Sequence, residues 1–196
     1  VRITTARYYT PSGRSIQRPY GEGINYMDDF EARASHGELL SGDSIQADTT
    51  KAYTTLKGRT VYGGGGVTPD LFVPTDTVES SAYLTDLFFS GTLTQFAFDV
   101  ADRERQKLLA RYSSSEEFAK SFQVGADLLA ELDRYAQKEG IAKRPADAAR
   151  SRELIAMRIK AGIARNVWGD DSYYRILLGK DPAYRRARVE LEMSRT

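Results

Sequence analysis

The chain has 196 residues, of which 41% are hydrophobic and 28% charged, an ordinary composition for a globular protein. Its formal net charge is +1, and residues 1–76 (8 basic, 9 acidic) and 77–196 (20 basic, 18 acidic) are each nearly balanced. This balance argues against nucleic-acid or anionic-membrane partners. The absence of cysteine excludes disulfides and thiolate metal sites. The sequence has no apolar run long enough to span a membrane, about 18 residues.

The chain opens with VRITTARYYTPSGRSIQ, which is rich in β-branched and aromatic side chains up to Thr10. Such a composition is typical of a half-buried strand, so we expect one over Val1–Thr10. Pro11 cannot donate to a strand ladder and Gly13 permits a turn, which predicts the end of the strand. Because the pattern is already that of a strand at Val1, we expect the chain to be a C-terminal fragment of a longer protein, with any targeting signal upstream.

A polar excursion follows and is expected to form an insertion, residues 18–59, lying over the sheet. A segment of this length in a compact domain normally has elements of its own. The sequence predicts a short helix over Asp28–Ala34. It also predicts weak strands at Ala52–Leu56 and Thr60–Tyr62, on either side of a turn at Lys57-Gly58.

A second strand-like stretch, GRTVYGGGGVTPDLFVP, covers Gly58–Pro74 and ends in the apolar run Leu71–Val73. We expect it to meet the strand of Val1–Thr10 in one sheet, because each strand alone would leave an unpaired edge. Composition changes after Pro74–Asp76. The sequence therefore predicts two domains, residues 1–76 and residues 77–196.

The second domain is expected to be helical, because its apolar residues follow a helical period from Ser80 onward. Capping boxes are predicted at Thr92 with Gln95 and at Ser114 with Glu117. The next apolar stripe, Leu128 to Tyr135, is expected to end at Gly140.

The segment Ser151–Trp168 is apolar around most of a helix circumference, which indicates a helix buried among its neighbours. Only narrow polar strips interrupt it, Arg158 with Arg165 and Glu153 with Lys160. A last helix is predicted to start at Asp181-Pro182, with Asp as the cap and Pro in the first position. Its arginines, Arg185, Arg186 and Arg188, are expected to be solvated.

The motifs TTARYYTPSGRSIQ and GVTPDLFV resemble the end of the protease domain in the carboxyl-terminal processing peptidases, serine peptidases of the tail-specific protease group. The intervening residues, with HGEL and GRTVYGGGG, resemble a subgroup common in Bacteroidetes-type bacteria. The resemblance covers about the first 76 residues at motif level, and the helical part matches loosely around AGIARNVWG.

The resemblance implies a periplasmic or cell-envelope endopeptidase that uses a Ser/Lys pair. Serine becomes a nucleophile only when a base takes its proton, and lysine serves as that base only when burial lowers its pKa. In the family both members of the pair, and a peptide-binding PDZ domain, precede the TTARYYTPSGRSIQ motif. The resemblance therefore implies no catalytic residue, no cofactor and no metal ligand within this chain.

The residues that could suggest a catalytic site of another kind have simpler structural explanations. Ser12 and Ser15 lie in a predicted turn, where serine forms local hydrogen bonds, and they are weaker candidates for pairing with Lys51 or Lys57. His36 is the only histidine. Together with Ser35 and Asp28 or Asp29 it would make a triad only if the fold oriented all three groups, and a loop histidine is the simpler interpretation.

Three further patterns are also weak. Gly63–Gly66 lacks the Gly-Lys-Ser/Thr ending of a phosphate loop, and a backbone role is favoured. The acidic residues Asp28, Asp29 and Glu31 could bind a cation, but their loose spacing favours a solvated loop. Arg158 and Arg165 are expected to form ion pairs within the helical domain rather than an anion site.

We therefore expect an α+β chain: a partial β-sheet segment of a protease domain followed by an α-helical C-terminal domain. Its expected partners are the upstream protease and PDZ parts, protein or peptide substrates, and a possible second copy. The fragment itself is expected to be inactive, with a structural or docking role. The alternative is a non-catalytic interaction module that binds extended peptides by strand addition at an open sheet edge.

Overall fold

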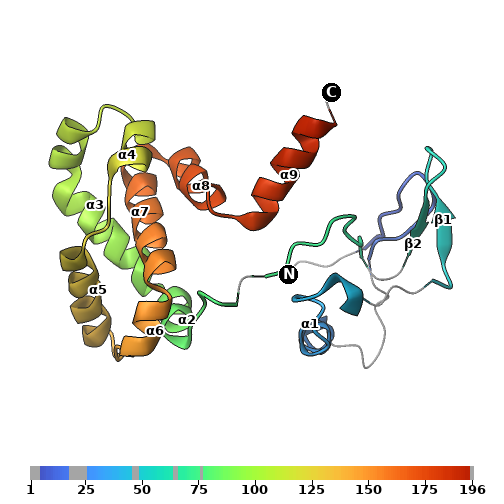
Figure 1. Cartoon of the computed structure of the whole chain (residues 1–196), viewed down its shortest axis with the longest axis horizontal. Coiled ribbons are helices and arrows are strands. Elements are labelled where there is room, and N and C mark those ends of the chain that lie inside the picture. The colour runs from blue at the N-terminus through green and yellow to red at the C-terminus, as the bar shows by residue number, and fades with distance from the viewer. Residues whose placement is uncertain (1–4, 18–25, 46–48, 64–65, 76, 195–196) are drawn as a thin grey trace. The chain divides into compact units, whose positions relative to one another are not determined.

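The computed structural model describes residues 5–17, 26–45, 49–63, 66–75 and 77–194. It divides into two compact units, Val1–Thr75 and Asp76–Thr196. Most described elements are helices, with one small antiparallel sheet, so the chain is α+β at a coarse level (Figure 1). Among the described residues, none of the helices combines the length and apolar character needed to cross a membrane.

The described residues of the first unit form two helical segments and a short hairpin. The helix α1 spans Tyr26–Ser35 and the 3-10 turn η1 spans Gly42–Ser44, while the strands β1 and β2 span Ala52–Thr54 and Thr60–Tyr62. The strands pair antiparallel with Tyr53 opposite Val61. Gly58, at a positive φ of 78°, turns the chain between them. The expected helix near Asp28 and the expected hairpin are confirmed, although β1 is shorter than predicted.

The strand expected over Val1–Thr10 is wrong for its described part. Residues 1–4 lie outside the described residues, and residues 5–10 form only one isolated bridge, Tyr9 with Ser15. The turn after Thr10 folds the chain back on itself, so the amide of Gly13 bonds to the Thr10 carbonyl at 2.8 Å. Thr10 therefore forms its backbone hydrogen bonds with the turn that follows it rather than with a neighbouring strand. The described sheet contains β1 and β2 alone.

The stretch Leu71–Val73 is also not a strand in the structure. It runs beside η1 instead, where Phe72 lies so close to Gly42 that a β-carbon there would come within 3.1 Å of Phe72 Cβ. The amide of Thr75 bonds to the Leu39 carbonyl at 2.9 Å. These contacts hold the end of the first unit against the segment that follows α1.

The second unit is built from helices. Their bounds are α2 (Ala82–Phe89), α3 (Thr92–Arg111), α4 (Ser115–Ser121), α5 (Ala126–Lys138), α6 (Pro145–Arg150), α7 (Arg152–Trp168), α8 (Asp170–Leu178) and α9 (Pro182–Met193). The helix α7 is the centre of this unit, because α3, α4, α6 and α8 all pack against it (Figure 1). Ile155, Ile159 and Ile163 are each 3% exposed or less. The prediction of a buried central helix is confirmed.

The closest approach within the bundle is the crossing of α3 and α7. A β-carbon added to Gly162 would lie 2.6 Å from Ala97 Cβ, which is well inside van der Waals contact. The neighbouring residues Ala101, Ala161 and Ala164 are small and fully buried. Small side chains on both helices therefore let the two backbones approach closely.

Several predicted helix ends are confirmed. Ser114 caps α4 by accepting a hydrogen bond from the Glu117 amide at 3.2 Å, although the Glu117 carboxylate bonds back to Ser113 rather than to Ser114 itself. Gly140 ends α5 with a positive φ of 81°. The amide of Ile141 then reaches the Ala136 carbonyl at 2.9 Å, which is the hydrogen bond of a Schellman motif.

The capping box predicted at Thr92 is wrong. Gly91 takes the N-cap position of α3 and Thr92 is already helical. The Thr92 hydroxyl is buried and pairs with the Ser90 hydroxyl at 2.8 Å, while Gln95 donates to Asp99 at 2.9 Å. The left-handed conformation of Gly91, with φ 78°, places the start of the helix one residue earlier than the box would.

Substituting Gly162→Ala tests the close crossing of α3 and α7. Alanine normally favours a helix over glycine by about 1 kcal/mol. Here the new methyl group would collide with Ala97, so we expect the free energy of unfolding to fall by about 1–3 kcal/mol. Urea unfolding followed by circular dichroism measures the change. The double variant Ala97→Gly/Gly162→Ala restores the space, and it should lose less stability than the two single changes added together. A stabilised Gly162→Ala variant would contradict the crossing.

Candidate functional site

An open groove lies between α3 and α5 in the second unit. Its volume is about 670 Å³. The α3 wall is made by side chains that recur on one helix face, and the other walls come from the end of α4, the start of α5 and α7. The α3 wall comprises Val100, Arg103, Glu104, Lys107, Leu108 and Arg111.

The inner surface of this groove is apolar and aromatic. Tyr112, Phe122, Leu128 and Ile163 line it. Phe122 stacks on the fully buried ring of Phe118 with centroids 4.5 Å apart, so the groove surface is continuous with the core. The floor is therefore supported by rigid packing, as ligand sites usually are.

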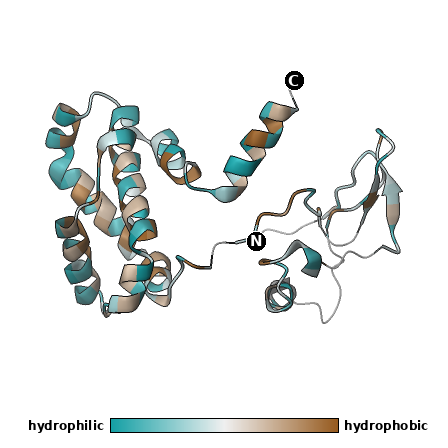
Figure 2. Ribbon diagram, in the orientation of Figure 1, coloured by the Kyte–Doolittle hydropathy of each residue, from teal (hydrophilic) through white to brown (hydrophobic). Residues whose placement is uncertain are grey.

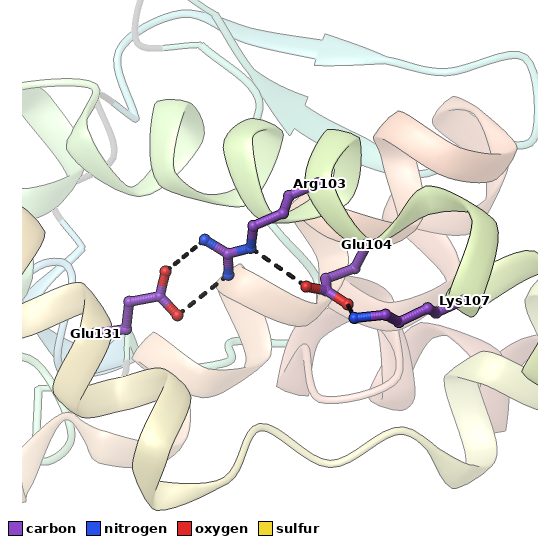
Figure 3. Close-up of polar contacts among 4 residues, drawn as sticks. All are labelled: Arg103, Glu104, Lys107 and Glu131. Atoms are coloured by element: carbon purple, nitrogen blue, oxygen red, sulfur yellow. Dashed lines mark hydrogen bonds and ion pairs between the residues drawn. The ribbon is translucent and has the colours of Figure 1, made fainter.

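Charged side chains cross the rim (Figure 3). Arg103 on α3 donates to both carboxylate oxygens of Glu131 on α5, at 2.7 and 3.2 Å. Its Nε also bonds to Glu104 at 3.3 Å, and Glu104 pairs with Lys107 at 2.8 Å. A bidentate arginine–carboxylate pair fixes orientation as well as distance, so this pair joins α3 and α5 across the groove.

The pKa values of this cluster shift as the pairing requires. The hydrogen bond to Glu131 is the main cause that raises the pKa of Arg103, and the bond from Lys107 is the main cause that lowers the pKa of Glu104. Ion pairs that are exposed to solvent, as these are, add little to the stability of a protein. The cluster is better suited to positioning and recognition than to stability.

Two rim arginines have no carboxylate in ion-pair range among the residues that the structure describes. These are Arg111, which lies over the Tyr112 ring at 5.5 Å, and Arg134. Asp127 is the remaining acidic residue of the lining and has no described ion pair either. The groove thus combines an apolar floor with an excess of positive charge available on its rim. This arrangement can bind an amphipathic partner.

A smaller cavity of about 270 Å³ lies between α2, α5 and α6. Tyr83 is fully buried here and donates its hydroxyl to Asp133 at 3.0 Å. Lys143 pairs with the other Asp133 oxygen at 2.6 Å. Burial, followed by the hydrogen bond to Asp133, raises the pKa of Tyr83 well above its ordinary range. Tyr83 therefore stays protonated and acts as a hydrogen-bond donor that ties α2 to α5.

The serines considered as nucleophiles make local contacts. Ser12 shares a hydrogen bond with the Thr10 hydroxyl at 2.9 Å, and Ser15 donates weakly to the Gln17 carbonyl at 3.5 Å. Lys51 and Lys57 are exposed. The described contacts bring neither lysine to either serine.

His36 is exposed and follows α1. Its neighbour Ser35 donates to the Ala32 carbonyl at 2.7 Å, as a serine at the end of a helix often does. Asp28 and Glu31 are exposed on α1, and the side chain of Asp29 lies outside the description. No catalytic triad, and no group of three His, Asp or Glu side chains placed to hold a metal, is found within the described ranges.

The glycine-rich stretch has a backbone role where it is described. Gly63 is buried, and a β-carbon there would come within 2.7 Å of the Tyr53 ring. Gly66 has a positive φ of 90°, which favours glycine. Gly64 and Gly65 lie outside the described residues. Close approach at Gly63 and turn geometry at Gly66 account for the described part of the stretch.

The polar strips of α7 pair partly as predicted. Arg165 forms an ion pair with Asp170 at 2.6 Å, which confirms the expectation for that residue. Arg158 instead lies over the Phe88 ring, 4.5 Å from its centroid. Glu153 pairs with Lys180, and Lys160 donates to the Ala119 carbonyl at 2.6 Å. Burial lowers the pKa of Lys160, but one carbonyl partner gives it a structural role in joining α7 to α4.

Sequence reasoning missed the groove, although one signal was present. Arg103, Glu104 and Lys107 place opposite charges on a single face of α3, beside the apolar positions Val100 and Leu108. A face of this kind indicates a partly exposed helix surface. The charge pattern of α3 could not identify Glu131 as the partner of Arg103, because Glu131 lies 28 residues further along the chain.

Comparison with known proteins gives one partial match. Residues 83–169 match the model of a protein family of unknown function (DUF8443). This range runs from the second residue of α2 to the residue after α7, so it includes both cavities and excludes α9. Neither the curated proteins nor the solved structures contain a match.

Replacing Tyr83→Phe tests the buried tyrosine. Loss of the hydrogen bond to Asp133 should lower the free energy of unfolding by about 1 kcal/mol at pH 8. The raised pKa means that the folded state keeps the phenol proton above about pH 10, whereas the unfolded chain releases it. The parent protein therefore loses this contribution to stability as the pH rises above 10, and the variant does not.

Urea unfolding at pH 8 and pH 10.5 measures both effects. The stability difference between the parent and Tyr83→Phe should shrink at the higher pH. Tyr174→Phe, at a side chain that is 56% exposed, is the matched control and should change little at either pH. A difference that stays constant or grows with pH would contradict the assigned role of Tyr83.

Proposed function

We propose that this chain is the C-terminal part of a periplasmic or cell-envelope serine endopeptidase that cleaves proteins near their C-termini. In this proposal the catalytic Ser/Lys pair and the PDZ domain precede the chain. Residues 1–76 complete the protease domain, and the helical unit supports it or docks partners. The resemblance of TTARYYTPSGRSIQ and GVTPDLFV to the end of such protease domains is the first support.

The burial pattern of the first unit is the observation that carries the proposal. Every buried hydrophobic residue among the described ones lies in the second unit, from Tyr83 to Ala164. In the first unit Tyr8 is 86% exposed, Leu56 90% and Val67 66%. Unfavourable exposure of this extent is expected of a segment whose apolar side chains pack against another part of a larger domain.

The contacts made by Arg14 support the same interpretation. Arg14, within the TPSGRSIQ motif, donates to the Tyr62 carbonyl at 3.1 Å and so links the motif to β2. A β-carbon on Gly63 would come within 3.3 Å of the Arg14 side chain. The TPSGRSIQ motif therefore lies beside the GRTVYGGGG segment within the unit, as two segments of one domain should.

A peptidase assay on the longer gene product tests the proposal. We expect hydrolysis of unfolded proteins, and loss of that hydrolysis when the serine of the upstream Ser/Lys pair is changed to alanine. Ser12→Ala, in the local turn, is the control and should retain activity. The 196-residue chain alone should hydrolyse nothing. Equal activity with and without the upstream serine would overturn the peptidase assignment.

That outcome would favour the second candidate, a non-catalytic module that binds peptides by strand addition. The observation that favours it is the sheet itself. Each of β1 and β2 has a strand neighbour on one side only among the described residues, so each leaves an edge to which an extended peptide could bond.

Amide hydrogen exchange tests whether the first unit belongs to a larger domain. In the 196-residue chain, the amides of residues 52–62 should exchange quickly, because little apolar burial protects them. In the longer protein the same amides should exchange at least about tenfold more slowly. Amides within α7 serve as the internal control and should behave alike in both proteins. Equal exchange of residues 52–62 in the two would contradict the proposed packing.

A further inference from the structure

The smaller cavity of the second unit, about 270 Å³ in volume, has a mostly apolar lining that includes three charged side chains. Leu132 and Ile155 in this lining are 3% exposed or less, so the apolar wall is part of the packed core. Figure 2 shows hydrophobic and hydrophilic segments alternating along α5, which supplies both kinds of lining residue. An apolar lining with a few polar groups is typical of a ligand site. The charged side chains are Asp133, Lys143 and Arg152.

Both carboxylate oxygens of Asp133 are already paired. They accept from the Tyr83 hydroxyl at 3.0 Å and from the Lys143 ammonium at 2.6 Å. Tyr83 is completely buried, so packing holds this network in one arrangement. An ammonium group carries three donors, and the described contacts of Lys143 use one of them. Lys143 is therefore fixed beside the cavity with donors left for a ligand.

Arg152, the first residue of α7, is exposed, and its side chain has no ion pair or hydrogen bond with any residue that the structure describes. The neighbouring carboxylate of Glu153 pairs with Lys180 at 2.6 Å, and Asp133 pairs with Lys143. Two cationic side chains and one anionic side chain line the cavity, which leaves an excess of one positive charge. A guanidinium is a planar fork that binds a carboxylate through two parallel hydrogen bonds. Arg152 is therefore the group available to bind an anion.

We propose that this cavity binds a small monocarboxylate, with its carboxylate on Arg152 and its apolar body against Leu132 and Ile155. One carboxylate neutralises the excess positive charge, and the remaining donors of Lys143 are available to the same group. The volume is below the range of about 300–1,000 Å³ that holds drug-sized ligands, so the ligand has about ten non-hydrogen atoms or fewer.

The lining also separates this ligand class from two others. An inorganic anion would leave the apolar lining without a partner, and a free amino acid would bring its ammonium group close to Lys143 and Arg152. All lining residues lie within residues 83–169, the range that matches the family of unknown function. The proposal does not depend on the proposed peptidase activity.

Titration of the isotope-labelled full chain with isocaproate, followed by NMR, tests the ligand class. We expect saturable shifts at amides within residues 143–152, with a dissociation constant of about 10 mM or lower. Isocaproamide lacks the charge and acetate lacks the apolar body, so each should bind at least about tenfold more weakly. The absence of saturable shifts, shifts confined to other residues, or equal binding of isocaproate and either analogue would overturn the proposal.

Substitution of the available arginine tests the charged contact. Arg152→Gln should weaken isocaproate binding at least about tenfold, because it removes the bidentate charged partner. Arg152→Lys keeps the charge without the planar fork and should bind with an intermediate affinity. Arg150→Gln makes the same charge change at an exposed residue outside the lining, and it should alter the affinity less than about twofold. Equal effects of Arg152→Gln and Arg150→Gln would show only a general attraction to positive charge and would overturn the site.

Filling the cavity tests the apolar contact without changing any charge. Ala149→Phe adds a ring at an exposed lining residue and should weaken isocaproate binding at least about tenfold, because the ring occupies the space of the ligand. Ala146→Phe, at an exposed residue of the same helix outside the lining, is the matched control and should bind as the parent protein does. Urea unfolding confirms that both variants are folded. Unchanged binding by folded Ala149→Phe would place the ligand elsewhere and would contradict the proposal.

Discussion

The helical unit depends on the close crossing of α3 and α7. At Gly162 and Ala97 there is no space for another methyl group. Ala101, one turn further along α3, and Ala161 and Ala164 on α7 are also small and fully buried. The approach of the two backbones allows Phe96 on α3 and Ile159 on α7 to be almost completely buried. Tight packing of this kind defines one position of each helix, because a shift in either direction would create a collision or a void.

The groove is a consequence of how the remaining helices are accommodated. The helix α5 packs against α3 near Phe96, where Tyr135 meets the Phe96 ring edge-on at 5.5 Å. Toward the other end of α3, Phe122 from the loop before α5 lines the groove together with residues of both helices. Arg103 and Glu131 then span the remaining gap with a bidentate ion pair. The apolar contact of Phe96 with Tyr135 therefore holds α3 and α5 together at one end of the groove. The ion pair of Arg103 with Glu131 joins the two helices where the groove is open.

Much of the helical unit was predictable because its signals are local. The nearly all-round apolar character of Ser151–Trp168, the Asp181-Pro182 start and the Gly140 end each depend on a few adjacent residues. The prediction of a cap at Thr92 was wrong because Gly91, one residue earlier, takes the N-cap position in a left-handed conformation that threonine rarely adopts. The groove was not predictable, since Arg103 and Glu131 meet only through the packing of two helices. The strand at Val1–Thr10 failed for a related reason: strand composition indicates a suitable surface but not a pairing partner.

The two units differ in how they satisfy their apolar residues, and this difference bears on function. The second unit buries its rings against one another, with Phe118 in contact with Tyr112, Phe122 and Trp168. It also leaves large apolar side chains exposed outside this core, such as Phe89 at 81%. The first unit has exposed tyrosines beside the TPSGRSIQ turn and no buried hydrophobic residue among its described ones. Apolar side chains exposed on a unit that has its own core indicate a surface for association. Apolar side chains exposed on a unit with no described core indicate a segment that needs neighbouring parts of a larger domain to fold. The proposed protease packing is therefore tied to the first unit, whose exposed apolar residues have no described core of their own to cover them.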